Sequence, residues 1–349
     1  MAKPEALHGR IFGRCSMSSS SLRLGVIGTG HVARRAHLPA WTTLPDAELV
    51  ALCDTDPEAL DAAQRCIPQR SLPAFDNARD LLAADMDAVS VCTPNMAHFP
   101  IVLAALEAGK HVLCEKPLCV TADEVKALGA AADKRGLILM VRHPLRFGTS
   151  AREAIESMRA GAAGEVRHVR VRALRRDRIP TLPGLIDRTL AGGGVALDLG
   201  VHALDMALWL MDFPRVTAVT GTVQTRYGRD PDFVGRWGGW DRARFTVEDT
   251  ASGHVRFDNG VTLSIECAWA GDFDPAEEGL SCTVSGDRGT VHWAAGESPE
   301  PSQPDFAAFL AAIRTGGPSP VSWREALPSI AILEGLYRSA QNGREVALY

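Results

Sequence analysis

Three side chains form a pattern that suits removal of a proton from a hydroxyl group. Asp198 and His202 are four residues apart, so on a helix they would share one face. A carboxylate beside an imidazole fixes its tautomer and raises its basicity, which makes His202 a candidate general base. Lys116 follows a short apolar run, and its ammonium could stabilise negative charge developing on oxygen. We expect Lys116, Asp198 and His202 to be catalytic and to contact the substrate.

The same residues also have plain structural interpretations. An Asp and a His four apart are often only a pair on a helix surface, and a lone Lys after a strand is usually solvated. Asp205 continues the same face and is expected at least to stabilise the helix. A metal site is the weaker interpretation, because two ligands do not complete one and no third His or Cys cluster is evident. We therefore expect no metal.

A glycine pattern near the start of the chain predicts a dinucleotide site. Gly28, Thr29, Gly30, His31, Val32 and Ala33 fit G-x-G-x-x-A between an expected strand and an expected helix. The glycines permit a tight turn and close approach of backbone N–H groups to a pyrophosphate, and the helix N-terminus favours the anion. We expect residues 28–32 to contact the cofactor.

The residue at the end of the second expected strand distinguishes NAD from NADP. Asp54 could accept hydrogen bonds from the ribose hydroxyls, and its charge would repel the 2′-phosphate of NADP. No Lys or Arg follows in residues 55–58 to neutralise it. The sequence therefore favours NAD, and the alternative is that Asp54 only caps the following turn.

The elements that must position these residues alternate through the first part of the chain. Apolar runs typical of buried strands alternate with helical segments, which predicts an α/β fold with a doubly wound parallel Rossmann sheet. The expected strands are 22–27, 49–53, 88–92, 111–114 and 137–141, and the expected helices include 32–43, 98–108 and 121–135.

After about residue 145 the pattern changes. Several strand-like runs follow one another with few helices between them, and Asp258, Asn259 and Gly260 form a strong hairpin-turn signal. These runs predict a C-terminal α+β domain with a large, mostly antiparallel open sheet. We divide the chain into a disordered leader (1–20), a Rossmann domain (21–145) and a substrate-binding and oligomerisation domain (146–349). The expected strands here are 165–174, 216–226, 245–257, 261–270, 280–285 and 290–293, and the expected helices are 150–159, 198–211, 305–314 and 323–342.

Composition excludes several classes of protein. Among 349 residues, 37 Lys and Arg stand against 42 Asp and Glu, and this net charge of −5 gives no basic face for nucleic acid. No run reaches the ~18 apolar residues of a membrane span, so no membrane partner is expected. None of the eight cysteines forms a C-x-x-C pair, which favours reduced thiols and a cytoplasmic location.

Four segments together resemble the glucose–fructose oxidoreductase and inositol dehydrogenase family, often written Gfo/Idh/MocA. Each is similar to a family motif, and their order along the chain matches. They are Glu115-Lys116-Pro117; Thr93-Pro94-Asn95 with His98; the glycines 192–194 followed by Asp198, Gly200, His202 and Asp205; and the run 247–251 with the turn 258–260.

The resemblance carries expectations about roles. It implies a nicotinamide-dependent oxidoreductase whose catalytic set is Lys116, Asp198 and His202, with a cis bond before Pro117. It also implies cofactor contacts from Thr93, Pro94, Asn95, His98, Glu115 and Lys116. Members of the family commonly form homodimers or homotetramers through the second sheet, so we expect one of these assemblies.

The sequence indicates only a broad class of substrate. A small molecule with a hydroxyl or keto carbon, such as a sugar, polyol or sugar acid, is expected. Arg146 is our candidate for a clamp on a carboxylate or phosphate, while a solvated basic surface is the alternative for it and for the arginines at 175, 176, 178 and 188. The connection 226–244, with Trp237 and Trp240, is either a lid or stacking surface or part of a subunit interface.

Three functions compete at this stage. The first is a dehydrogenase or reductase that exchanges its cofactor with solution. The second is an NAD-dependent glycoside hydrolase that oxidises its substrate transiently, and the third is a non-catalytic dinucleotide-binding regulator. A regulator would typically have lost Lys116 or His202, and both are present.

Overall fold

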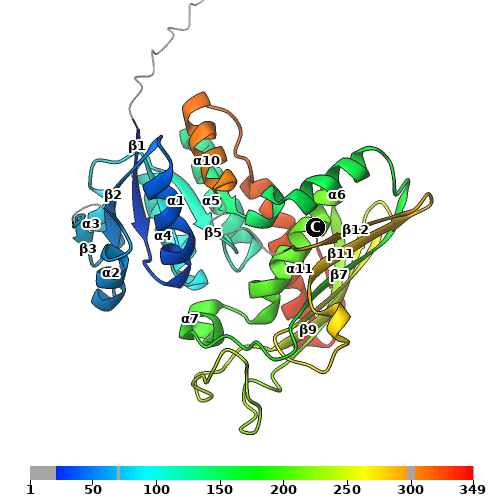
Figure 1. The fold of residues 1–349 in the computed structure, drawn as a ribbon. Helices are drawn as coiled ribbons and strands as arrows, with labels where there is room; N and C mark the ends of the chain where they lie inside the picture. Colours follow the sequence, from blue (N-terminus) through cyan, green and yellow to red (C-terminus); the bar gives the residue numbers. More distant parts are fainter. Residues whose placement is uncertain (1–20, 69–70, 297–302, 349) are drawn as a thin grey trace, which may run out of the picture.

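The computed structural model describes residues 21–68, 71–296 and 303–348. The predicted leader, residues 1–20, lies outside the described residues. Two sheets dominate the fold, and helices separate them (Figure 1).

The first sheet has six parallel strands in the order β3-β2-β1-β4-β5-β6. The central strand β4 is a short run that is buried on both faces, as a sheet with helices on both sides requires. The order reverses between β1 and β4, and ligands bind in the crevice at such a switch point. The predicted Rossmann sheet is confirmed. Its strands are β1 (Leu22–Ile27), β2 (Ala47–Cys53), β3 (Ala74–Phe75), β4 (Ala88–Val91), β5 (His111–Glu115) and β6 (Leu139–Arg142).

The helices of this part begin and end at recognisable caps. The side chain of Thr121 accepts a hydrogen bond from the Glu124 N–H at the start of α5, and Gly136 ends that helix in the left-handed region. The predicted helix 32–43 is two elements, a π-helical turn followed by an α-helix. The elements are η1 (Ala33–His37), α1 (Leu38–Thr43), α2 (Pro57–Gln64), α3 (Ala78–Leu82), η2 (Asn95–Ala97), α4 (His98–Glu107), α5 (Ala122–Arg135) and η3 (Pro144–Phe147).

The second sheet has seven strands in the order β12-β11-β7-β10-β9-β8-β13. Only β7 and β10 pair in parallel, so the predicted mostly antiparallel sheet is confirmed. Gly260, with φ +83°, closes the predicted hairpin between β9 and β10. The strands are β7 (Val166–Leu174), β8 (Val216–Gln224), β9 (Thr250–Phe257), β10 (Thr262–Ala268), β11 (Gly279–Gly286), β12 (Thr290–Ala294) and β13 (Val346–Ala347).

The strand predicted for 245–257 begins five residues late, at Thr250. The N–H of Thr246 donates instead to the carbonyl of Ile186, in the segment that borders the first domain. Phe245 and Val247 are fully buried there, so their apolar character reflects packing outside the sheet.

Helices α9 and α11 cover one face of the second sheet and lie between it and the first domain (Figure 1). The segment Arg188–Leu210 is long and apolar enough to span a membrane, but 83% of its apolar window is buried inside the protein, as in a core helix. The helices of this part are α6 (Thr149–Arg159), α7 (Pro183–Ile186), α8 (Arg188–Ala191), η4 (Ala196–Gly200), α9 (Val201–Leu210), η5 (Pro275–Glu277), α10 (Pro304–Thr315) and α11 (Trp323–Asn342).

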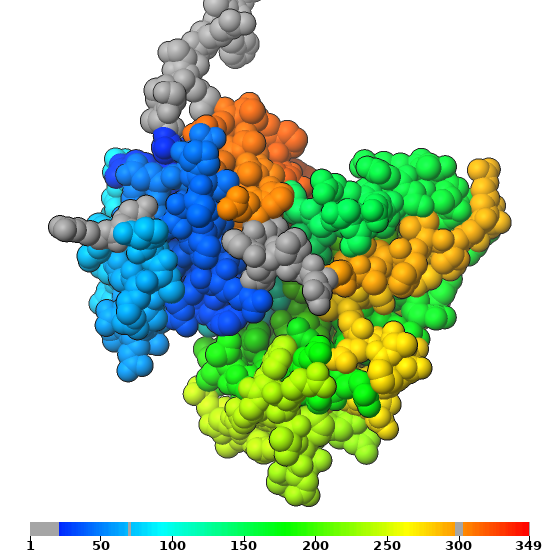
Figure 2. Space-filling model, viewed as in Figure 1, coloured from blue at the N-terminus to red at the C-terminus, as the bar shows by residue number. Residues whose placement is uncertain are grey.

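Helix α10 packs on the first domain although it follows the strands of the second. The ring of Phe306 lies 4.8 Å from that of Trp41, and Asp305 accepts a hydrogen bond of 2.8 Å from Arg142 Nε. In Figure 2 this orange segment lies against the blue surface of the first domain. The chain therefore passes to the second domain, returns to the first at α10 and leaves it again with α11.

Candidate active site

A cavity of about 950 Å³ opens between the carboxyl edge of the first sheet and the segment that contains α7 and α8. Both domains contribute to its wall. Most residues predicted to contact cofactor or substrate line it: Gly28, Gly30, His31, Val32, Asp54, Thr93, Pro94, Asn95, Glu115, Lys116 and Asp198.

The glycine turn has the shape that a dinucleotide requires. Gly28 has φ +86°, and a Cβ there would lie 2.7 Å from the backbone of Cys92 and Thr93, so only glycine fits. A Cβ on Gly30 would meet no atom within 4 Å, because this residue borders the cavity. That opening lets a pyrophosphate approach the backbone at the start of the following helix.

Asp54 lies at the carboxyl end of β2, in the wall of the same cavity. Its Oδ2 accepts hydrogen bonds from the backbone N–H of Thr29 (2.7 Å) and from its Oγ1 (3.1 Å). Thr29 is fully buried and does not line the cavity. The carboxylate is thereby fixed beside the glycine turn, where an adenosine ribose would meet it.

His98 is the first site prediction that the structure corrects. The ring is fully buried, and its two nitrogens lie 2.8 and 2.9 Å from the carbonyl oxygens of Pro117 and Thr93. Burial lowers the pKa of His98 below its usual range. It therefore connects the turn at Thr93 to the segment after Lys116, and it does not line the cavity.

The catalytic prediction brings together side chains from the two domains. Lys116 Nζ donates to the backbone carbonyl of Asp198 (2.9 Å) and to its carboxylate Oδ1 (3.1 Å). The bond between Lys116 and Pro117 is cis, as predicted. The indole of Trp269 donates to the other carboxylate oxygen of Asp198 at 3.0 Å. Trp269 was not predicted from the sequence; it lies just beyond the end of β10, two residues after the buried Cys267.

The charges around Asp198 keep it ionised. Burial by itself raises its pKa, but the ammonium of Lys116 and the guanidinium of Arg175 outweigh burial, so the pKa is lowered. Its backbone is fixed by the turn before it. Glu248 accepts hydrogen bonds from the N–H groups of Gly194 and Ala196, at the start of the helical segment that carries Asp198.

His202 lies near this pair but does not bond to it. Both oxygens of Asp198 are occupied by Lys116 and Trp269, and within the described ranges His202 Nδ1 has no hydrogen-bond partner. The expected pairing, in which Asp198 would fix the tautomer of His202, is therefore not formed. Burial, assisted by the charges of Lys116 and His143, holds the pKa of His202 well below its usual range. The low pKa favours the neutral imidazole and makes it a weaker base than an ordinary histidine, opposite to the raised basicity expected from the sequence.

Glu115 lines the cavity, but both of its carboxylate oxygens have protein partners. His37 Nε2 lies 2.8 Å and Arg142 Nη1 2.9 Å from Oε1, and the Lys116 N–H donates to Oε2. Burial alone would raise its pKa, yet Arg142 and His37 hold the pKa of Glu115 far below its usual range. Its place beside Lys116 indicates that it orients this segment.

The prediction for Arg146 is wrong. Its guanidinium is buried and donates two hydrogen bonds to Asp205 (2.8 and 2.6 Å) and one to Glu325 (2.8 Å). Trp209 and Phe213 pack against it at 5.6 and 5.2 Å. With its three nitrogens occupied, Arg146 joins three segments of the second domain and is not available as a substrate clamp.

Apart from Asp198, the part of the cavity wall that the second domain supplies was not predicted from the sequence. Leu182, Leu185 and Leu190 line the cavity around α7 and α8. Asn95 Nδ2 donates to the carbonyl of Ala191 (2.9 Å), which ties this segment to the first domain. Within the described ranges, no three His, Cys, Asp or Glu side chains are grouped so that they could hold a metal ion.

Comparisons with known proteins agree with this geometry. Residues 22–143 match the model of an oxidoreductase family with an NAD-binding Rossmann fold, and residues 151–292 match a GFO/IDH/MocA C-terminal domain. D-glucoside 3-dehydrogenase of Escherichia coli is 36% identical over 74% of this chain and 73% of its own length. Inositol 2-dehydrogenase of Rhizobium meliloti is 27% identical over 94% of this chain and 99% of its own length.

A solved structure shares the whole architecture. The oxidoreductase domain protein from Kribbella flavida has a TM-score of 0.80 and 25% identity, and the match covers 95% of this chain and 100% of that one. The two family models together match most of the present chain, the first over the Rossmann sheet and the second over most strands of the second sheet. The chain belongs to the Gfo/Idh/MocA family of NAD(P)-dependent oxidoreductases.

Proposed function

We propose that the protein is an NAD-dependent dehydrogenase that oxidises a secondary hydroxyl of a sugar, polyol or sugar acid to a ketone. One observation carries the proposal. The ammonium of Lys116 lies at the wall of the cavity that begins at the glycine turn, and it is paired with Asp198 from the other domain. A cation and an ionised carboxylate at this place suit binding and polarisation of a hydroxyl group.

The residues present fit the cofactor. Gly28 and residues 30–32 would hold the pyrophosphate, Asp54 the adenosine ribose, and residues 93–95 would line the path towards Lys116. NAD, when bound, supplies the acceptor for the hydride that leaves the substrate carbon. Asp54 supports NAD over NADP, because its charge opposes a 2′-phosphate.

The chain's own residues would handle the substrate proton and the charge on oxygen. Lys116 would donate a hydrogen bond to the substrate oxygen and stabilise the negative charge that grows as the O–H bond breaks. His202, neutral because of its burial, would accept that proton. Asp198 would hold the ammonium of Lys116 in place through their ion pair.

An absorbance assay tests this function. The purified protein would be mixed with NAD and a panel of aldoses, polyols and sugar acids, and NADH would be followed at its absorbance band. Formation of NADH that depends on Lys116 and His202 supports the proposal. Release of a sugar with no net NADH would overturn it in favour of glycoside hydrolysis, whereas NAD binding with no turnover of any kind would favour a regulator.

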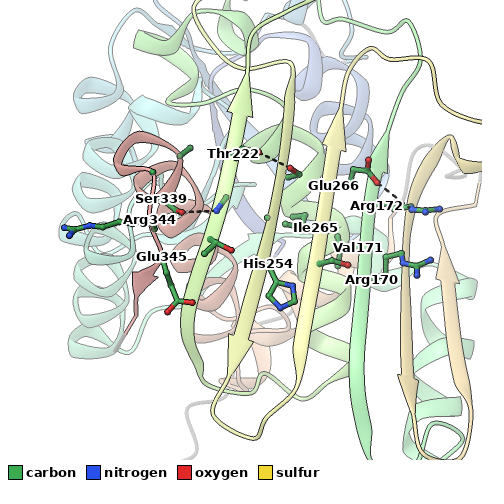
Figure 3. A pocket seen from close by; sticks show the side chains of 17 residues that line it. Arg170, Val171, Arg172, Thr222, His254, Ile265, Glu266, Ser339, Arg344 and Glu345 are labelled. Carbon is green, nitrogen blue, oxygen red and sulfur yellow. Dashed lines mark hydrogen bonds and ion pairs between the residues drawn. The ribbon is translucent and has the colours of Figure 1, made fainter.

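We also propose that two or four copies assemble through the outer face of the second sheet. Figure 3 shows this face, where Arg170, His254, Thr222 and Glu266 project from neighbouring strands around a shallow hollow of about 770 Å³. The face opposite the helices is thus wide and lined by hydrogen-bonding groups, which suits a polar interface. Light scattering on the native protein and on His254→Glu tests it, and a wild-type monomer at micromolar concentration would overturn it.

A cytoplasmic location is the last part of this proposal. Every cysteine in the described ranges is a free thiol, and six of these seven are buried. Free thiols are typical of reducing compartments. Fractionation of cells that produce the native chain would test the location.

A further inference from the structure

Arg175 directly follows β7, on the side of the strand that faces the helices. Side chains alternate along a strand, so Arg175 falls on the same face as Val171 and Ala173, both fully buried under the helices. Its N–H donates to the carbonyl of Ala268, which continues the pairing of β7 with β10 by one residue. Arg175 thus continues the face of β7 that packs against η4, the element that contains Asp198.

The guanidinium of Arg175 lacks the partner that its neighbours have. Arg176 pairs with Asp272 and Arg178 with Glu278, at 3.4 and 3.0 Å. Within the described part of the chain, Arg175 forms no ion pair within 4.0 Å. Its charge nevertheless lowers the pKa of Asp198, so it acts on the catalytic carboxylate through space. Burial lowers the pKa of Arg175, and the nearby charges of Asp198 and Glu278 offset that effect only in part.

One face of this guanidinium is covered by an aromatic ring. Trp237 lies 4.6 Å from it, ring centroid to guanidinium carbon, and the side chain of Trp237 is 49% exposed. A stacked guanidinium keeps its N–H groups in the plane free, so it can still receive a carboxylate edge-on. An exposed indole is also a suitable surface for the apolar face of a sugar ring.

The segment that carries Trp237 is anchored next to Arg175. The N–H of Arg236 donates to the carbonyl of Asp177 (2.7 Å), and its guanidinium pairs with the same residue at 3.1 Å. Trp240 is buried, and its indole donates to the carbonyl of Gly228 (2.7 Å). The connection 226–244 therefore holds Trp237 over Arg175 through specific contacts.

We propose that Arg175 and Trp237 form a subsite for the carboxylate of a sugar acid, so that uronic or aldonic acids are the preferred substrate class. Arg175 binds the carboxylate with two parallel hydrogen bonds, and Trp237 packs against the sugar. A single guanidinium without a close ion pair carries one positive charge, which matches a carboxylate better than a phosphate dianion. This inference rests on the proposed dehydrogenase function and specifies its substrate.

Matched pairs of substrates test the subsite. The ratio kcat/KM is measured with NAD for D-glucuronate against D-glucose and for D-galacturonate against D-galactose. Wild type should prefer the acid of each pair by about 10-fold or more, because a hydrogen bond to a charged group is stronger than one to a neutral group. Arg175→Ala should lose about 10- to 100-fold on the acids and change the neutral sugars far less. Arg176→Ala, at the adjacent paired arginine, is the control and should leave the preference unchanged.

The ratio within a pair separates recognition from catalysis. Loss of the Arg175 charge also affects Asp198, but that effect lowers the rates for both members of a pair equally. Equal losses on acid and neutral sugar, or a wild type without preference for acids, would overturn the subsite and leave the dehydrogenase function standing.

Calorimetry provides a readout that does not require turnover. D-glucuronate is titrated into wild type, Arg175→Ala and Trp237→Ala, each saturated with NADH. Binding by wild type that is lost in Arg175→Ala supports the subsite even if no substrate is turned over. Equal binding by wild type and Arg175→Ala would refute it, whereas absence of NADH formation with every substrate counts only against the proposed function.

Discussion

Lys116 Nζ lies 2.9 Å from the backbone carbonyl and 3.1 Å from the carboxylate of Asp198, a residue 82 positions later in the chain. An ammonium has three N–H donors, and two of them are used here. The third remains for a substrate oxygen. The same contact joins the two domains, so the geometry that holds the catalytic cation depends on the cleft being closed.

Replacement of Lys116 should abolish most of the activity without unfolding the protein. For Lys116→Ala we expect kcat to fall by about 10²–10³-fold, the usual cost of losing one donor to a developing oxyanion. Binding of NADH, followed by fluorescence, should weaken much less. Lys126→Ala removes an exposed ammonium that pairs only with Asp123 and is the matched control. Activity of Lys116→Ala within a few-fold of wild type would show that another group polarises the substrate.

The pH dependence of the oxidation reports on His202. Its folded pKa is lowered, so the basic form persists as the pH falls through the ~6.5 of an ordinary histidine. We expect kcat/KM to stay level from neutral pH down past ~6.5 and to decline only in more acidic buffer. His202→Asn should be about 10²–10⁴-fold slower and lack that acidic decline. A wild-type ionisation near ~6.5 that disappears in His202→Asn would contradict the assigned burial effect.

Asp54 should control the choice between the two nicotinamide cofactors. In Asp54→Ser the repulsion of a 2′-phosphate is removed, so the ratio of kcat/KM for NAD over NADP should fall by at least about tenfold, which corresponds to ~1.4 kcal/mol. Because Asp54 also accepts from Thr29, the variant Thr29→Val separates loss of that hydrogen bond from loss of charge. An unchanged cofactor ratio in Asp54→Ser would show that the carboxylate only caps the turn.

Arg146 should matter for stability and not for recognition. Arg146→Ala leaves Asp205 buried without its partner, and breaking a buried ion pair in this way costs about 3–5 kcal/mol in free energy of unfolding. Urea unfolding followed by circular dichroism measures it, with Arg152→Ala on the exposed side of α6 as the control. Under conditions where Arg146→Ala is folded, KM for the substrate should match that of wild type. A large rise in KM in Arg146→Ala, with normal stability, would show that Arg146 does contact the substrate.

The strands and the glycine turn were predictable because their signals are local. The apolar run before Gly28 is buried in any parallel sheet, and the positive φ of Gly28 follows from the tight turn between strand and helix. The pairing of Lys116 with Asp198 was implied by family resemblance, since spacing alone does not place residues 82 positions apart.

The errors concern partners that are distant in sequence. Nothing near Arg146 indicates that Asp205 and Glu325, 59 and 179 positions away, will take its donors. The carbonyl partners of His98 belong to Thr93 and Pro117, on either side of α4 and β5. They come together only when both of these elements are folded. In the sequence Arg175 is one of several similar arginines. In the structure it differs from Arg176 and Arg178 because they form ion pairs and, among the described residues, it does not.

The return of the chain to the first domain at α10 has a mechanical consequence. Two domains joined by one linker can rotate relative to each other in many directions. Two domains connected at several separated points are restricted mainly to one hinge rotation. Opening along that rotation would widen the cofactor cleft and at the same time draw Asp198 away from Lys116. Cofactor entry would then require the open arrangement of the domains, and the contact between Lys116 and Asp198 would require the closed one.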